Sequence, residues 1–108
     1  MRRNTPIAEE TANKIYDVLV EVTGVHVPKD MDTSRMSFVR YAMEGSWTEF
    51  RFGFPLGFGG KVWNNAGRWY VACYREDDSP VRNEIIERTN AALDKLFEET
   101  YGEPPRKW

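Results

Sequence analysis

The glycine cluster Gly57-Phe58-Gly59-Gly60-Lys61 is the part of this sequence closest to a phosphate-binding loop. A Walker-type loop requires G-x-x-x-x-G-K-[ST] and opens a helix, because amide groups at the helix N-terminus hold the anion. Here Val62 follows the lysine, Pro55 stands in place of the first glycine, and the next segment has the pattern of a strand. The cluster is therefore interpreted as a bend between strands, with Lys61 as its one candidate contact for a small nucleotide.

Other reaction centres lack their partners in the sequence. His26 is the single histidine and Cys73 the single cysteine, which is too few for a zinc site or a nucleophilic triad. The run Asp30-Met31-Asp32 begins like a calcium loop, but Arg35 and Tyr41 stand where that loop needs glycine and glutamate. The sequence predicts no catalytic residues, no cofactor and no metal.

Two amphipathic helices are predicted, over about 6–22 and 80–101. Each is preceded by a hydroxyl residue and opens with a proline, as Thr5-Pro6 and Ser79-Pro80, which is typical of a helix N-cap and first turn. Gly24 and Gly102 are placed to end the two helices. The C-terminal tail, 103–108, is predicted to be loose or to lie along the surface.

Between the helices the spacing of apolar residues changes from helical to alternating, which is typical of strands. Strands are predicted over about 36–43, 47–54, 61–64 and 68–75. The expected fold is one α+β domain over residues 1–108, in the order α-β-β-(β)-β-α. It would form an antiparallel meander sheet with two helices packed on one face.

The uncovered face of this sheet is the predicted binding surface. Arginine and aromatic side chains supply much of the binding energy of protein interfaces. The predicted partner-binding residues are Arg40, Arg51, Trp63, Tyr70 and Tyr74. The alternative is an ordinary solvated face whose charges pair with each other, for example Glu49 with an arginine.

Nucleic acid is the second partner class to consider. The order helix–strands–helix is similar to that of the double-stranded RNA-binding domain, whose last helix opens with phosphate-binding lysines. Here the matching stretch, 76–82, is acidic, so that function is not expected. The remaining alternative is a single strand stacked on the open face, with Tyr70, Tyr74 and Trp47 as platforms and Arg40, Arg51 and Arg68 as phosphate contacts.

Composition fits a globular protein: 41% of residues are hydrophobic, 30% are charged and the net charge is −2. With a single cysteine, a disulfide framework is excluded, and a reducing compartment is expected. The basic N-terminus lacks the apolar stretch of a signal peptide, and no apolar run is long enough to span a membrane. A cytoplasmic protein without a membrane partner is therefore predicted.

The middle of the chain resembles a known sequence pattern. The run Leu56-Gly57-Phe58-Gly59-Gly60-Lys61 is similar to the "LGFGGKF…WYVNCYPED…P" pattern of small proteins from actinobacteriophages (mycobacteriophage-like). The similarity continues at Trp63, at 68–71, at Cys73-Tyr74, at Glu76-Asp77 and at Pro80. The resemblance covers 49 to about 92, with departures at Ala72 and Arg75. It implies the cytoplasm of an infected bacterium. The predicted function is a non-catalytic accessory protein that binds a host or phage protein, or a second copy of itself.

Overall fold

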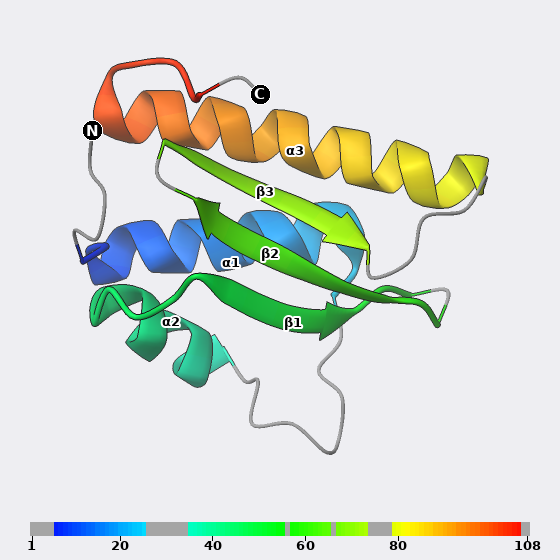
Figure 1. Cartoon of the computed structure of the whole chain (residues 1–108), viewed down its shortest axis with the longest axis horizontal. Coiled ribbons are helices and arrows are strands. Elements are labelled where there is room, and N and C mark those ends of the chain that lie inside the picture. Colours follow the sequence, from blue (N-terminus) through cyan, green and yellow to red (C-terminus); the bar gives the residue numbers. More distant parts are fainter. Residues whose placement is uncertain (1–5, 26–34, 56, 66, 74–78, 107–108) are drawn as a thin grey trace.

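The computed structural model describes residues 6–25, 35–55, 57–65, 67–73 and 79–106. In chain order its elements are α1 (Glu9–Thr23), α2 (Arg35–Met43), β1 (Glu49–Gly53), β2 (Gly59–Asn65), β3 (Arg68–Cys73) and α3 (Pro80–Tyr101). The strands form one antiparallel sheet in the order β1-β2-β3, and α1 and α3 lie side by side over one of its faces (Figure 1). The predicted α+β class, with a meander and two helices on one face, is confirmed.

The core lies between the sheet and the two long helices. Alternate side chains of each strand point into it, as the predicted period of two requires. Trp69 of β3 is 1% exposed, and its ring packs at 5.0 Å from Phe97 and 5.6 Å from Tyr101 at the end of α3. The other buried core residues of the three strands and the two long helices are Phe50, Phe52, Val62, Val71, Ala12, Ile15, Tyr16, Leu19 and Leu93.

The prediction of a strand over 36–43 is wrong, because this segment is the helix α2. Phe38, Val39 and Ala42 are all buried. Spacings of one, three and four residues bring these side chains to one side of a helix, whereas a strand would divide them between its two faces. The sheet consequently has three strands rather than four.

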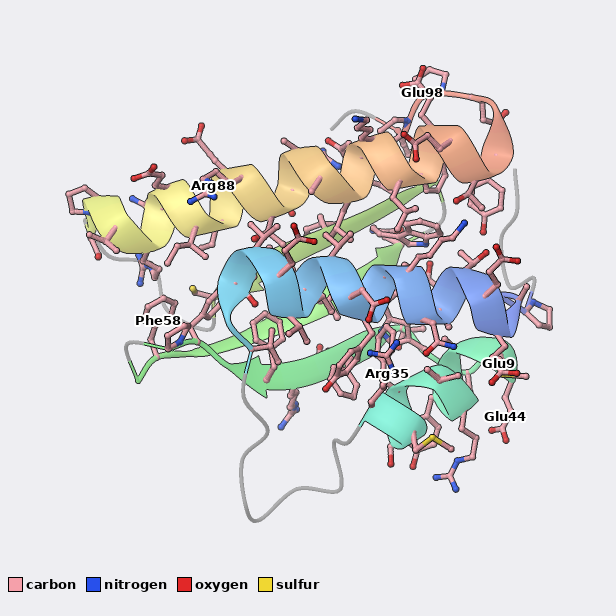
Figure 2. The ribbon with its side chains drawn as sticks, turned by 180° about the vertical axis from the view of Figure 1, so that it is seen from behind. Glu9, Arg35, Glu44, Phe58, Arg88 and Glu98 are labelled. Atoms are coloured by element: carbon pink, nitrogen blue, oxygen red, sulfur yellow. The ribbon has the colours of Figure 1, made fainter. Side chains whose placement is uncertain are left out.

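Arg35 joins the start of α2 to α1. Its Nη1 lies 2.6 Å from Asp17 Oδ1, and its Nε donates to Asn13 Oδ1 at 3.1 Å. The guanidinium also lies 5.1 Å from the centre of the Tyr16 ring. The hydrogen bond to Asp17 raises the pKa of Arg35 above its ordinary value. Figure 2 shows this arginine at the junction of the two helices, where it links α2 to α1.

The helix ends agree with prediction at three of four places. Ser79 Oγ accepts a hydrogen bond from the Arg82 amide at 3.3 Å, and Pro80 is the first residue of α3. Gly24 and Gly102 end their helices in the left-handed conformation, with φ of 66° and 71°. The exception is the start of α1.

The cap predicted at Thr5-Pro6 is wrong, although Thr5 itself lies outside the described residues. The N-cap of α1 is Ala8, which makes no side-chain cap hydrogen bond. Ile7 is buried instead, and its amide donates to the Ala42 carbonyl at 3.2 Å. Burial of Ile7 therefore holds Pro6 outside the helix.

Of the two arrangements predicted for the tail, the described residues 103–106 show the second, in which the tail lies along the surface. The Arg106 amide donates to the Gly67 carbonyl at 2.6 Å, which holds the tail against the turn between β2 and β3. Gly102 in the left-handed conformation provides the change of direction that this contact requires.

The outer edge of β3 is covered by side chains of α3. Asn90 Oδ1 accepts from the Val71 amide at 2.7 Å, and Asn90 Nδ2 donates to the Val71 carbonyl at 3.2 Å. Arg68 at the start of β3 makes two bonds of 3.2 Å with Asp94. The carboxamide of Asn90 thus takes the place of a neighbouring strand at Val71.

Asn90→Ala is expected to lower the free energy of unfolding by about 2 kcal/mol, because it leaves a buried donor and acceptor of Val71 without these bonds. Urea denaturation of the variant and the wild type measures this effect. Asn83→Ala, at an exposed position of the same helix, is the control and should change stability by less than about 0.5 kcal/mol. Equal effects from both substitutions would contradict this role of Asn90.

Candidate binding surface on the open sheet face

The second face of the sheet is not covered by α1 or α3 and is called the open face below. The register sets Glu49 opposite Trp63 and Arg51 opposite Lys61 across β1 and β2. Trp63 is in turn opposite Tyr70 across β2 and β3. Cross-strand partners point to the same side of a sheet, so these five side chains form one continuous surface. In Figure 1 this face is toward the viewer, with the two long helices behind it.

An aromatic pair lies at the centre of the open face. The rings of Trp63 and Tyr70 are stacked, with centroids 6.2 Å apart and an angle of 20° between their planes. Lys61 Nζ lies 4.3 Å from the centre of the Trp63 ring, which is a cation–π contact. Both aromatic residues are half-buried, so the pair presents a flat apolar patch with a cation at its border.

Glu49 connects the two cations of the open face. Its Oε1 lies 3.1 Å from Arg51 Nε, and its Oε2 lies 4.0 Å from Lys61 Nζ. The side chain of Arg51 remains 61% exposed, against 22% for Lys61 and 26% for Glu49. The expected pairing of Glu49 with an arginine is therefore present, and Arg51 is the most exposed of the three charged side chains.

The structure gathers three of the five predicted partner-binding residues. Arg51, Trp63 and Tyr70 lie together on the open face. Arg40 does not: it belongs to α2, where its guanidinium lies 4.9 Å from the centre of the Tyr41 ring. Its assignment to the sheet was wrong because it depended on the strand predicted over 36–43. Tyr74 and His26 lie outside the described residues.

Of the residues proposed to hold a nucleic-acid strand, the structure brings Arg51 and Tyr70 together on the open face but not Trp47 or Arg40. Trp47 is 3% exposed, and its ring packs at 5.0 Å from Phe38 in the core, so the platform predicted there is wrong. Arg68 is engaged with Asp94 of α3. Lys61 lies on the open face beside Trp63. The two residues are two positions apart in β2, so the alternation of side chains along the strand could have predicted this.

The first two residues of the glycine cluster, Gly57 and Phe58, lie in the turn between β1 and β2, where a bend was predicted, and the other three already belong to β2. Phe54 closes this turn: its amide donates to the Phe58 carbonyl at 2.8 Å, and its carbonyl accepts from the Gly57 amide at 3.1 Å. Gly57 has φ of 84°, a conformation that favours glycine. These hydrogen bonds occupy backbone groups of the loop and connect the end of β1 to the start of β2.

Within the described part of the chain, no three His, Cys, Asp or Glu side chains come close enough to hold a metal ion. None of the helices described there has both the length and the apolar character needed to cross a membrane.

Comparison with known proteins gives no match: no family model, curated protein or solved structure shows significant similarity to this chain.

Proposed function

We propose that this protein acts by binding another protein through its open face, without catalysing a reaction. The observation that carries the proposal is the stacked pair of Trp63 and Tyr70 with Arg51 projecting beside it. Aromatic and arginine residues supply most of the binding energy at interfaces, and those near the centre of the contact contribute most. The setting implied by the sequence resemblance makes the partner a phage protein or a protein of the infected bacterium.

The charges of the open face favour a protein over a nucleic-acid strand. Surfaces that bind single strands combine stacking aromatics with a groove of uncompensated positive charge. Here both cations, Arg51 and Lys61, share the carboxylate of Glu49, which leaves a net charge of only +1 on the five residues of the face. A charge-balanced patch around an aromatic centre is more typical of a protein interface.

The proposal is tested by capture from actinobacterial lysate with three forms of the tagged protein, each with and without nuclease. Arg51→Glu combined with Tyr70→Ala changes the open face. Arg88→Glu combined with Val81→Ala changes two exposed residues of α3 and serves as the matched control (Figure 2 labels Arg88). A partner of the open face should be retained by the wild type and the control and lost by the open-face variant, in both nuclease arms.

The purified partner then gives a quantitative result. Loss of a central arginine and a central aromatic should weaken binding by at least about thirtyfold, or about 2 kcal/mol. Isothermal titration calorimetry measures this, and far-UV circular dichroism checks that the variant is folded. Equal binding by the open-face variant would refute the site. Capture that disappears with nuclease, and affinity that falls steeply with salt, would instead indicate a nucleic acid.

A further inference from the structure

Helix α2 exposes more apolar surface than its size explains. Five large hydrophobic residues are exposed in the described part of the chain, and three of them belong to this nine-residue helix. They are Met36 at 77%, Met43 at 41% and Tyr41 at 40%. Exposed methionines that cluster are characteristic of surfaces that bind another protein, because their side chains adapt to the partner.

These methionines border a hollow of about 450 Å³ beside α2 and the start of α1. Its lining includes Met36, Val39, Arg40, Met43 and Glu44, with Glu9 from α1. Figure 2 shows Glu9 and Glu44 at the same end of the two helices. The hollow and its border are called the α2 groove below.

The charges around the α2 groove are not neutralised within the described residues. Neither Glu9 nor Glu44 forms an ion pair with any described cation. Arg40 likewise has no carboxylate partner among the residues that the structure describes, and its guanidinium lies over the Tyr41 ring at 4.9 Å. The groove therefore carries one cation and two anions, so a ligand that itself carries both signs of charge could pair with the cation and with one of the anions.

We propose that this ligand is a second copy of the chain, bound through α2 in a twofold-symmetric dimer. In such a dimer every contact occurs twice: if one residue contacts a second residue of the other copy, the second residue of the first copy contacts the first residue of the other. A surface that carries both signs of charge can therefore complement itself. An antiparallel pair of α2 helices, with its twofold axis at the height of Ala42, sets Arg40 of each copy opposite Glu44 of the other. Met43 then meets its counterpart near the axis, and Glu9 adds to the negative charge facing Arg40.

The contact between the two copies is small. Helix α2 has nine residues and is about 13 Å long, and with the axis at Ala42 only its last turn faces the other copy, so the contact buries less than the roughly 1,600 Å² of a standard interface. We therefore expect a weak, concentration-dependent dimer in exchange with the monomer. The surface is separate from the open face, so the dimer leaves the proposed partner site available.

Charge exchange tests this dimer in the full chain. Arg40→Glu alone and Glu44→Arg alone each set like charges opposite one another and should raise the dissociation constant of the dimer at least about tenfold. The double variant Arg40→Glu/Glu44→Arg restores opposite charges and should recover most of the association. Sedimentation velocity over a wide range of protein concentration measures the association of the wild type and these three variants. A fifth protein, Met43→Glu, carries a charge near the twofold axis and should not associate.

Three results would overturn the proposal. A wild type that stays monomeric at every concentration excludes the dimer. Equal weakening by the double variant and by the two single variants excludes the reciprocal Arg40–Glu44 contact. Dimerisation lost in the open-face variant Arg51→Glu/Tyr70→Ala but kept in Met43→Glu would place the interface on the sheet. All substituted positions except Tyr70, which is half-buried, are exposed, so circular dichroism should show native helix content in each variant.

Discussion

Phe38→Ala is expected to lower the free energy of unfolding by about 3–5 kcal/mol, the largest effect of any single truncation proposed for this chain. Phe38 is fully buried, and its ring lies 4.8 Å from Phe50, 5.0 Å from Trp47 and 5.7 Å from Tyr16. One side chain thus joins α2 to α1, to β1 and to the segment before β1. A cavity at this point removes contacts with all of them at once.

Chemical denaturation, followed by far-UV circular dichroism, measures the loss. Met36→Ala shortens a side chain of the same helix that is 77% exposed, so it should cost less than about 0.5 kcal/mol and is the control. Small domains have total stabilities of about 5–15 kcal/mol, so Phe38→Ala removes a large part of the total. A loss below about 1 kcal/mol would show that α2 is not held to the core by this ring.

Gly60→Ala is expected to cost about 3 kcal/mol, although it adds only one methyl group. A Cβ at this position would lie 2.3 Å from Cε2 and 2.9 Å from Cδ2 of Phe54, and 3.1 Å from the Ala72 carbonyl oxygen. Phe54 is fully buried, with the rings of Phe52 at 4.7 Å and Phe58 at 4.4 Å, so it has little room to move. The new methyl group must displace the ring or the backbone of β3.

Gly57→Ala provides the comparison for Gly60→Ala. Gly57 has φ of 84° and no atom within 4 Å of an added Cβ, so its substitution introduces backbone strain without a clash, at about 1–2 kcal/mol. In a double-mutant cycle, Phe54→Leu should relieve part of the Gly60→Ala penalty, with a coupling of about 1 kcal/mol or more. Additive effects of Phe54→Leu and Gly60→Ala would show that the clash does not determine the stability.

The long elements were predictable because each has its own local signals. The serine cap, the proline and the terminal glycine define α3, and the alternation of Phe50, Arg51 and Phe52 defines both β1 and the side chains that face away from the helices. Arg51, Trp63 and Tyr70 could be placed on one face for the same reason. These features depend on neighbouring residues, so sequence is sufficient to find them.

The short helix was not predictable because α2 has apolar residues on all sides. Phe38 and Ala42 face the core, while Met36 and Met43 face outward, so the helical period is weak in a segment of nine residues. Its helical form depends on docking to α1 and on the clamp made by Arg35. The misplacement of Arg40 on the sheet followed from this single error. The hydrogen bond from the Ile7 amide to the Ala42 carbonyl joins residues far apart in the sequence, so no local signal predicts it.

The Asn90 carboxamide also limits how sheets of different molecules can join. Growth of a fibril by strand pairing requires two open sheet edges on every molecule, because each molecule must pair with one neighbour on either side. At Val71 the edge of β3 is occupied by Asn90, so a strand of another molecule cannot form its backbone hydrogen bonds with this residue. Edge-to-edge addition through β3 is therefore hindered, and replacing Asn90 removes this protection against polymerisation.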